Sequence, residues 1–268
     1  MLAIEQEEFD QLKDFIYNNY GIDLSKKKHL VEGRLGNTIV AKGYESFGQY
    51  FHHVYHDKTG NELSQLVNKI TTNHTYFMRE KSHFDFYRQT ILPSLERTVT
   101  EKNLGIWSAG CSTGEEAYTL AMLTDEYFSS RSKGWDTRIL ATDLSDRVLD
   151  VAQKGIYPES AVEELSAAYK QKYLNKCDEG YQFSNIIRKN VLFHKFNLMD
   201  SFNFKRKFHV IFCRNVMIYF DKKTKLELVK KFYEATEDGG YLLIGHSEYL
   251  EKDSLAYQYV MPAVYRKG

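Results

Sequence analysis

The stretch IWSAGCSTGEEAYTLAM, residues 106–122, organises the fold of this chain. It begins with an apolar segment typical of a strand and passes through a turn of small residues, Ser108–Gly114. The run Glu115–Tyr127 then carries apolar residues at helical spacing. A strand, a tight turn and a helix form the first unit of a nucleotide-binding α/β sheet, where small residues let a ligand approach the backbone. We therefore predict a nucleotide site at this turn.

Two carboxylates at the start of this predicted helix, Glu115 and Glu116, indicate which nucleotide binds. A dinucleotide would place its pyrophosphate there, because free N–H groups and the helix dipole favour an anion. The two glutamates would repel that anion, whereas they suit a ligand without phosphate that carries an ammonium or sulfonium, such as S-adenosylmethionine. The alternative is dipole complementation alone, since acidic residues are favoured in any first helical turn.

Four blocks of this sequence resemble the chemotaxis receptor methyltransferases, and they stand in that family's order. The blocks are TTNHTYFMRE (71–80), WSAGCSTGEEAY (107–118), FHVIFCRNVMIYF (208–220) and GGYLLIGHSE (239–248). The resemblance implies a protein-glutamate O-methyltransferase that uses S-adenosylmethionine, releases S-adenosylhomocysteine and needs no metal. It also implies the substrate, a glutamate side chain on the cytoplasmic domain of a methyl-accepting chemotaxis receptor, and a role in chemotactic adaptation.

Composition limits the class of protein. At 268 residues and 43% hydrophobic, the chain can bury the core of one large or two modest domains. Its 36 basic residues balance 36 acidic ones, so no overall field draws it to nucleic acid or to a membrane. The three cysteines, Cys111, Cys177 and Cys213, form no CxxC pair, which argues against a disulfide framework and a zinc site.

The sequence also bears on compartment and metal binding. The first ten residues are acidic rather than basic and apolar, unlike a signal peptide, and no apolar run reaches transmembrane length. His52, His53 and His56 share a predicted helix, but no carboxylate stands at HExxH spacing, so we expect no metal there. We expect a cytoplasmic, monomeric protein that binds no nucleic acid and does not insert into a membrane.

Helical periodicity without a convincing strand fills the first part of the chain, and we expect residues 1–72 to form an all-helical domain. Residues 73–104 should connect it to the rest of the chain and contribute to the cofactor cleft, with Pro93 interrupting a helical stretch. The predicted helices are an apolar stripe from Phe9 to Ile16 that ends at Gly21, a segment after Ser25, Ser46–Tyr55 and Glu62–Ile70.

Strand-like and helical runs alternate over residues 105–268, which we predict to be the methyltransferase domain. Such alternation implies a mainly parallel sheet with helices on both faces, a doubly wound α/β fold. The terminal runs Tyr257–Val260 and Ala263–Arg266 resemble the antiparallel edge of S-adenosylmethionine-dependent methyltransferases. The earlier predicted strands are Ile106–Trp107, Arg138–Thr142, Val191–His194, Val210–Cys213 and Tyr241–Ile244, and the predicted helices include Arg147–Gln153 and Lys222–Tyr233, capped by Asp221.

A polar, tyrosine-rich segment at about residues 157–190 is too long for a simple crossover between strands. Tyr181–Phe183 and Ile186–Arg188 could pair across a short turn. The resembled family carries a small β-subdomain at this position, and we place it here. Relatives that grip a receptor's C-terminal peptide use a glycine-rich loop in that subdomain, whereas residues 176–183 read KCDEGYQF. With one glycine and two acids there, we expect no dependence on a tethering peptide.

Asp143 ends the second predicted strand, in ATDLS. At the carboxyl edge of the sheet a carboxylate can accept both ribose hydroxyls, although it could instead cap the helix that follows. We favour the ribose role because Asp143 neighbours a glycine-turn unit, and the resemblance implies the same role. The other cofactor contacts that the resemblance implies are Glu115 in the turn, Asn197 and Leu198 on the adenine side, and Cys213 and Arg214 after the fourth strand.

Asn73, Thr75 and Arg79 lie where the two predicted domains join. Polar residues at such a junction could be ordinary linker chemistry, but the resemblance makes all three part of the cofactor pocket. The family usually shows two phenylalanines before this arginine, and here they are Phe77 and Met78. Because methionine packs adaptably, we expect Arg79 to keep its position.

Tyr219 follows the fourth strand and would by default be a half-buried ring with a satisfied hydroxyl. The resemblance implies that Tyr219 and Arg79 flank the reacting methyl group as catalytic residues. Receptor methylation helices are acidic and this protein has no net charge, so a local cationic helix in the N-terminal domain should recognise the substrate. Its residues are Lys26, Lys27, Lys28 and Arg34, which by base rate would be a solvated face.

Other classes of protein stay open at this point. A nicotinamide-dependent oxidoreductase could use a similar sheet, although the two glutamates argue against it. A non-catalytic S-adenosylmethionine-binding adaptor would have no need of intact Arg79, Asp143 and Tyr219. A methyltransferase that acts on another protein carboxylate is a further alternative. A binding assay with the two cofactors and methyl incorporation into receptor would separate these readings.

Overall fold

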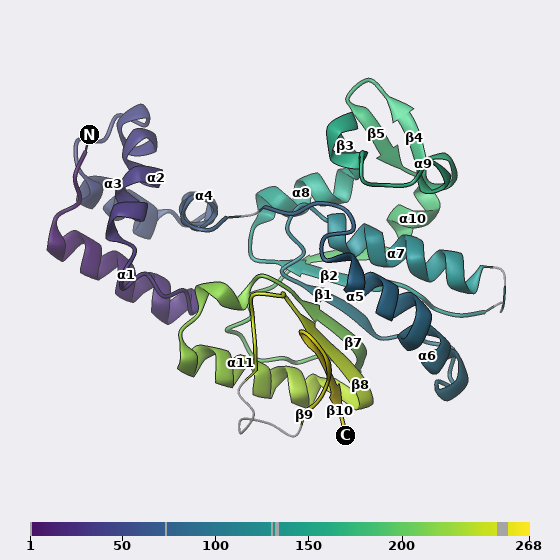
Figure 1. Cartoon of the computed structure of the whole chain (residues 1–268). Helices are drawn as coiled ribbons and strands as arrows, with labels where there is room; N and C mark the ends of the chain where they lie inside the picture. The colour runs from purple at the N-terminus through teal and green to yellow at the C-terminus, as the bar shows by residue number, and fades with distance from the viewer. Residues whose placement is uncertain (1, 73, 130, 132–133, 251–256) are drawn as a thin grey trace.

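The computed structural model describes residues 2–72, 74–129, 131, 134–250 and 257–268. Within these residues, four helices form an N-terminal domain beside a seven-stranded sheet, as Figure 1 shows. Each predicted helix of this domain is present, and Ser46 caps the third by accepting a hydrogen bond from the N–H of Gln49. The helices are α1 (Gln6–Tyr20), α2 (Lys28–Ala41), α3 (Phe47–His56) and α4 (Asn61–Ile70).

The end of α1 determines how the N-terminal domain meets the sheet. Gly21 ends the helix, as predicted, with a left-handed backbone (φ 67°), and its N–H donates to the carbonyl of Tyr17. A Cβ at Gly21 would lie 2.5 Å from the sulfur of Met199 and 2.8 Å from Thr224 Cγ2, so those side chains would have to move. Just beyond it, Ile22 forms an antiparallel β-bridge with Phe220. The two domains are therefore joined by close backbone contact.

The sheet has the strand order β6-β2-β1-β7-β8-β10-β9. Its first five strands are parallel, and β10 runs antiparallel to both β8 and β9, which confirms the predicted doubly wound sheet with an antiparallel edge. The order reverses between β1 and β7, and ligands of such sheets bind at the carboxyl ends of the strands at that point. The strands are β1 (Ile106–Ala109), β2 (Ile139–Asp143), β6 (Val191–Lys195), β7 (Phe208–Cys213), β8 (Thr236–Ile244), β9 (Tyr257–Met261) and β10 (Val264–Lys267).

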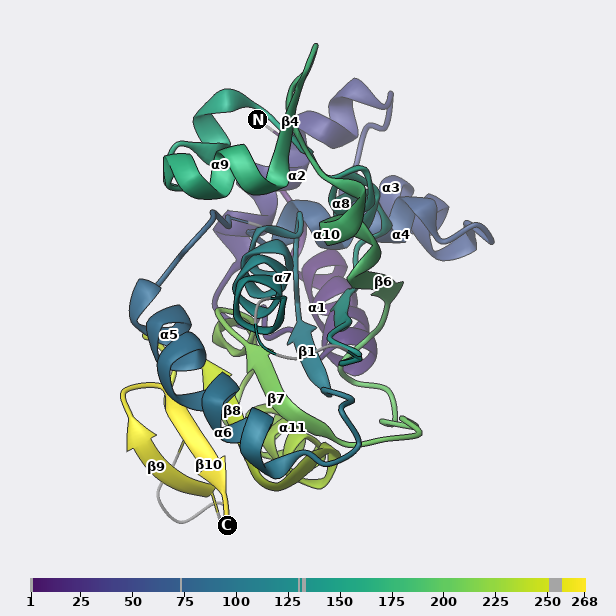
Figure 2. The same ribbon diagram turned by 90° about the vertical axis from the view of Figure 1, so that its right-hand side faces the viewer.

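Helices cover both faces of the sheet, as seen in Figure 2. Helix α7 and the segment from α5 to α6 pack on one face, whereas α11 and the N-terminal domain pack on the other. On that second face the buried Trp107 contacts Phe232, and its indole N–H donates to the Thr142 hydroxyl at 2.9 Å. The helices are α5 (Lys81–Phe86), a π-helical turn (Tyr87–Ile91), α6 (Leu92–Thr98), α7 (Glu115–Phe128), α8 (Asp146–Lys154) and α11 (Lys222–Ala235), the last capped by Asp221 as predicted.

A small subdomain is inserted between α8 and β6, and it stands apart from the main sheet in Figure 1. Its three strands have the antiparallel order β3-β5-β4. The predicted pairing of Tyr181–Phe183 with Ile186–Arg188 is wrong. The second of these runs is helical because Ile187 turns into the main core, where it is fully buried. The elements are β3 (Ile156–Tyr157), a 3-10 turn (Glu159–Val162), α9 (Ala167–Tyr173), β4 (Leu174–Cys177), β5 (Gly180–Phe183) and α10 (Asn185–Lys189).

A helix that crosses a bilayer must be long and apolar. Among residues 2–72, 74–129, 131, 134–250 and 257–268, no helix is long and apolar enough to do so.

Candidate functional site

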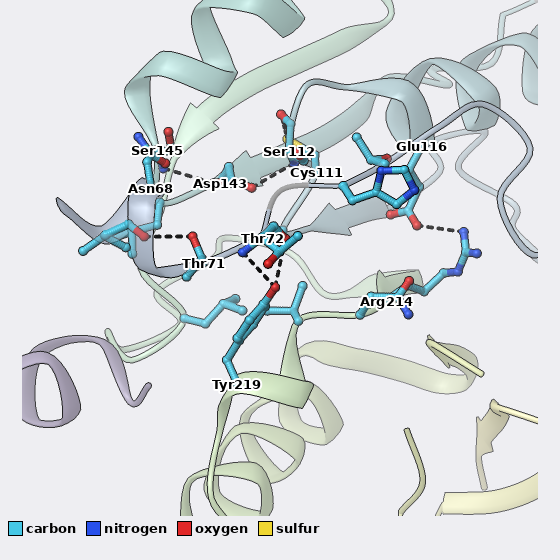
Figure 3. Close-up of a pocket in the computed structure, with 18 of the residues that line it drawn as sticks. Asn68, Thr71, Thr72, Cys111, Ser112, Glu116, Asp143, Ser145, Arg214 and Tyr219 are labelled. Carbon is cyan, nitrogen blue, oxygen red and sulfur yellow. Dashed lines mark hydrogen bonds and ion pairs between the residues drawn. The ribbon is translucent and has the colours of Figure 1, made fainter. Parts of the chain in front are cut away.

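A pocket opens at the carboxyl ends of the central strands, where the strand order reverses (Figure 3). About 1080 Å³ of space that no atom fills lies in and around it, including its open mouth. Both domains build its walls. The sheet domain contributes the turn after β1, the end of β2 and the loop after β7, while α1, α4 and the segment after α4 close the other side.

Gly110, Cys111 and Ser112, in the turn after β1, line the pocket. Gly110 and Gly114 have φ values of 82° and 96°, and Val216 packs directly on Gly110, where a Cβ would lie 2.3 Å from its Cγ2. The N–H groups of Gly110 and Cys111 donate to the carbonyl of Thr142 at 2.8 and 2.9 Å, which ties the turn to β2. The predicted small-residue turn is therefore held rigidly against the strand that carries the next polar residue.

That residue, Asp143, presents a carboxylate to the pocket. One oxygen accepts from the N–H of Ser112 at 2.8 Å and the other from the N–H of Ser145 at 3.0 Å, and the N–H of Leu144 also bonds the carboxylate, which as a whole has about four acceptor positions. Burial raises its pKa. The alternative role as a helix cap is filled by Ser145, whose hydroxyl accepts from the N–H of Val148 at the start of α8. Asp143 is thus free to accept hydroxyl groups of a ligand.

The two glutamates after the turn have different surroundings. Glu116 lines the pocket, where it accepts from the Ser108 hydroxyl at 2.7 Å and from Arg214 at 3.0 Å. Glu115 turns away and accepts from the Thr113 hydroxyl at 2.7 Å, so it is not among the described lining residues. Of the two, Glu116 is therefore the one placed at the pocket, and the contact of Glu115 with a cofactor stays a prediction. Successive helical residues point about 100° apart, and the sequence does not indicate which of the two faces inward.

Arg214 links three parts of the site. Its side chain is 2% exposed and pairs with Glu80 and with Glu116 at 3.0 Å each. It also donates to the backbone carbonyl of Arg79. Burial opposes the ionisation of Glu80, but Arg214 outweighs it and the pKa of Glu80 is lowered. Cys213, the preceding residue, is fully buried in the core and is not among the described lining residues, and the cofactor contact expected at this position stays a prediction.

Glu80 also belongs to a group that could hold a metal, together with His83 and His246. Their potential ligand atoms lie within 4.8 Å of one another. However, Glu80 already accepts two hydrogen bonds from Arg214. A guanidinium at this position neutralises the carboxylate and would repel a metal ion. We therefore assign Glu80 to holding Arg214.

The segment that joins the domains forms one side of the pocket. The Tyr219 hydroxyl accepts from the N–H of Thr72 at 3.0 Å and donates to its carbonyl at 2.9 Å (Figure 3). Thr75 and Arg79 line the pocket as predicted, and Arg79 donates to the carbonyl of His74 at 2.7 Å. Asn73, the third predicted residue of this segment, lies outside the described residues.

The substituted position before this arginine does not disturb it. Met78 and Glu80 both have a left-handed backbone, with φ values of 61° and 57°, so the chain bends sharply on either side of Arg79. Met78 packs against the core of the sheet domain. The bends direct Arg79 toward the pocket while Phe77, one residue earlier, is fully buried.

Asn197 and Leu198 follow β6 and both line the pocket, where the sequence placed them. The amide of Asn197 donates to the carbonyl of Asn19 at 2.8 Å and accepts from the N–H of Met199 at 3.0 Å. Because Asn19 belongs to α1, this side chain also fastens the N-terminal domain to the sheet. That second role could not be inferred from the sequence, in which the two asparagines are 178 positions apart.

The predicted cationic helix face is not present as such. Lys26 and Lys27 precede α2, and Lys28 donates to Gln6 within the N-terminal domain. The ammonium of Lys27 lies 5.5 Å from the ring centroid of Tyr219, at the pocket. Arg34 is engaged elsewhere. Its guanidinium donates at 2.8 Å to the carbonyl of Ile70 and to the hydroxyl of Thr72, the residue that Tyr219 also holds.

Sequence reasoning missed Glu80 and Thr72 as parts of the site. Both fall inside the block TTNHTYFMRE, so a signal was present, but their roles depend on long-range partners, Arg214 and Tyr219. From the sequence, Glu116 was interpreted only as a negative charge at the start of the helix. Its pairing with Arg214 means that it meets the pocket as half of an ion pair rather than as a free anion.

This sheet and its pocket at the point of strand reversal define the S-adenosylmethionine-dependent methyltransferase class. Family models confirm and narrow that assignment. The model described as CheR methyltransferase, SAM binding domain, matches residues 73–265, and the model described as CheR methyltransferase, all-alpha domain, matches residues 7–71. The chain therefore belongs to the CheR methyltransferase family, and S-adenosylmethionine is its cofactor.

Curated relatives agree over nearly the full length. A chemotaxis protein methyltransferase of Borreliella burgdorferi is 47% identical over 100% of this chain and 96% of its own. A probable chemotaxis protein methyltransferase of Rhizobium etli is 36% identical over 87% of this chain and 89% of its own. Chemotaxis protein methyltransferase 2 of Vibrio cholerae is 32% identical over 94% and 89% of the two chains.

The pocket fits this cofactor on its own geometry. Asp143 presents to the pocket a carboxylate that can accept hydrogen bonds from the hydroxyls of a ribose. Gly110, Cys111 and Ser112 of the turn line the pocket together with Asp143, so a ligand meets this turn beside a carboxylate. S-adenosylmethionine carries no phosphate, so its binding needs no phosphate site.

Proposed function

We propose that this protein methylates specific glutamate side chains on the cytoplasmic helices of bacterial chemoreceptors, for adaptation in chemotaxis, and that it works in the cytoplasm. The full-length similarity to proteins named chemotaxis protein methyltransferase supports the proposal. The observation that carries it is a pocket that Asp143, Arg79 and Tyr219 line from three parts of the chain. Such a pocket offers both a cofactor end and a substrate end.

A glutamate substrate explains why the site can work without a general base. Its unperturbed pKa is about 4.3, so the carboxylate is already ionised at neutral pH. S-adenosylmethionine supplies a methyl group on a positively charged sulfur, and in the transfer a carbon–oxygen bond to the carboxylate replaces the carbon–sulfur bond, whose electron pair stays on sulfur. Opposite charges cancel in that transfer, so positioning and partial dehydration of the carboxylate must provide the acceleration.

The residues of the chain suit positioning roles. Arg79 cannot accept a proton, because its guanidinium stays charged, but it can orient a carboxylate. Tyr219 holds the backbone of Thr72 with both hydrogen bonds of its hydroxyl, so it fixes the segment that carries Thr75 and Arg79. We propose that Arg79 and Tyr219 flank the reacting methyl group, and that Asn73, Thr75, Asp143, Asn197 and Leu198 bind the cofactor.

We propose that a cationic segment at the edge of the pocket, Lys26–Lys28, recognises the substrate. Lys27 lies beside Tyr219, and Lys26 and Lys28 flank it in sequence. An acidic receptor helix that reached Tyr219 would pass this segment. Arg34 contributes by fixing the end of α4 and Thr72, and so places the segment relative to the pocket.

The direct test is transfer of labelled methyl from S-adenosylmethionine to membranes that contain a chemoreceptor. Methyl esters of glutamate are hydrolysed by base, so the label should be released as methanol after alkaline treatment. Receptor with glutamine or alanine at its methylation sites is the control. Label that stays bound after base treatment, or that enters the control receptor equally, would contradict the proposed substrate.

A further inference from the structure

Glu248 lies after β8 and is enclosed by backbone, with the residue only 9% exposed. One carboxylate oxygen accepts from the N–H of Gly245 at 2.6 Å and from that of Asn215 at 2.9 Å, and the other accepts from Ile218 at 3.1 Å. The N–H of Met217 also bonds it. One side chain therefore ties the loop after β8 to the loop after β7.

The loop after β7, residues 214–220, needs such support. Asn215 has a left-handed backbone with φ 59°, which L residues adopt at some cost. The 3-10 turn Met217–Tyr219 begins with N–H groups that have no partner inside the turn, and Glu248 accepts from this end. Without the carboxylate, several buried N–H groups would lose their acceptor.

This loop forms a wall of the cofactor pocket. Val216 and Tyr219 line the pocket, and Val216 fills the space in which a Cβ on Gly110 would have to lie. On the other side, Gly245 approaches so closely that a Cβ there would lie 2.5 Å from Asn215 Nδ2 and 2.8 Å from its backbone nitrogen. The loop is thus fitted between two glycines, and a small shift would alter the pocket.

We infer that Glu248 is a positioning residue, whose carboxylate holds the 214–220 loop against the cofactor turn through bonds to backbone N–H groups. It is not among the lining residues that the structure describes, so it acts through Val216 and Tyr219. The effect on cofactor binding stands on the pocket alone. The effect on methyl transfer rests on the proposed function.

Glu248→Gln keeps the size of the side chain but turns an amide NH₂ toward backbone N–H donors. We expect the Kd of S-adenosylhomocysteine, measured by titration calorimetry, to rise about tenfold or more, which corresponds to the loss of one charge-assisted hydrogen bond. Receptor methylation should show a similar fall in kcat, with the KM for receptor changed by less than about twofold. Glu248→Asp, which restores the carboxylate, should recover part of the binding.

The matched control is Asp57→Asn in the N-terminal domain. The Asp57 carboxylate also accepts from backbone N–H groups, those of Thr59 and Glu62, but it is remote from the 214–220 loop in the fold. We expect this variant to lower Tm and leave the Kd unchanged.

A second variant, Gly245→Ala, displaces Asn215 without altering the carboxylate, and it should weaken binding in the same way. If Glu248→Gln does not fold, the Kd of Gly245→Ala tests the inference in its place. Unchanged Kd in the folded variants, or an equal loss in Asp57→Asn, would overturn the inference. A wild-type protein that binds S-adenosylhomocysteine but methylates no receptor would overturn the proposed function alone, because the binding arm still decides the role of Glu248.

Discussion

Among single residues, Asp143 has the most direct consequence for ligand binding, since its carboxylate is held toward the pocket by two backbone N–H groups. Asp143→Ala should weaken S-adenosylmethionine binding by about 1–3 kcal/mol, the cost of leaving buried polar partners unpaired. Titration calorimetry measures the change. Asp146→Ala, which removes an exposed carboxylate from α8, is the control. Unchanged affinity in a folded Asp143→Ala protein would show that the ribose assignment is wrong.

His83 should make stability depend on pH in a defined window. Burial, followed by the charge of Arg214, lowers its pKa from 6.5 to about 4, while Glu80 acts in the opposite direction. Between these values the unfolded chain binds a proton that the folded protein does not, so the free energy of unfolding should fall as pH drops from about 6.5 toward 4. The full loss is on the order of 3 kcal/mol, at about 1.4 kcal/mol per pKa unit.

Urea unfolding at several pH values checks this expectation. His83→Gln carries no titrating group, so its stability should fall less steeply between pH 6.5 and pH 4 than that of the wild type. All other titrating groups are shared by the two proteins and cancel in the comparison. Parallel curves for the two proteins would contradict a depressed pKa at His83.

For single residues, the sequence predicted most of the positions that line the pocket but not the residues that they contact. Asp143, Thr75, Arg79, Asn197 and Leu198 line the pocket as predicted, because strand ends and motif blocks fix where a side chain stands. The sequence could not decide which of two neighbouring residues faces the pocket. Whether a glutamate of the first helical turn faces the pocket or a nearby hydroxyl depends on the rotation of α7 against the sheet, which tertiary packing decides.

At the scale of elements, the segment after α4 is held to the loop after β7 by one hydroxyl group. Tyr219→Phe removes both hydrogen bonds to Thr72 and should release the segment that carries Arg79. We expect kcat to fall by about tenfold or more, since two hydrogen bonds of about 1 kcal/mol each are lost, with a smaller change in substrate KM.

Steady-state methylation kinetics provide the measurement. Tyr169→Phe is a matched control, because its hydroxyl donates to Glu126 on the far side of the sheet domain. If Tyr219→Phe preserves turnover and raises only KM, Tyr219 is a binding group instead of a positioning one.

Element prediction succeeded where a local signal was sufficient and failed where it was not. Gly21, Ser46 and Asp221 each mark a helix end, and all three were read correctly. In the inserted subdomain the true partners of β5 are β4 and β3, and β3 lies more than twenty positions away in sequence. Periodicity over a few residues cannot distinguish that pairing from a hairpin with the next apolar run, Ile186–Arg188.

For the whole molecule, the balance of charge bears on how a receptor is found. Because the chain has no net charge, we propose that a local patch, the Lys26–Lys28 segment with Lys27 beside Tyr219, attracts the receptor, and such attraction weakens as salt rises, with a screening length of about 8 Å at physiological ionic strength. We expect methylation of full-length and tail-deleted receptor to fall alike across a salt series, and Lys27→Glu to reduce both.

Lys225→Glu, on α11, controls for the change in total charge. A large loss on deleting the receptor tail, with indifference to salt and to Lys27→Glu, would show that a tethering peptide recruits the enzyme. Arg34 is unsuitable for this test, because its bonds to Ile70 and Thr72 couple any substitution to the pocket wall.

Both domains enclose the pocket, so a bound ligand also helps to hold the two domains together. A nucleoside held between Asp143 and the segment after α4 adds its binding free energy to the contacts that keep the domains together, about 2.7 kcal/mol when its concentration is 100 times Kd. The product, S-adenosylhomocysteine, keeps the same nucleoside contacts after methyl transfer. Its departure removes that contribution, and the domains are then held by the protein's own contacts, among them the hydrogen bonds of Tyr219 and Arg34 to Thr72.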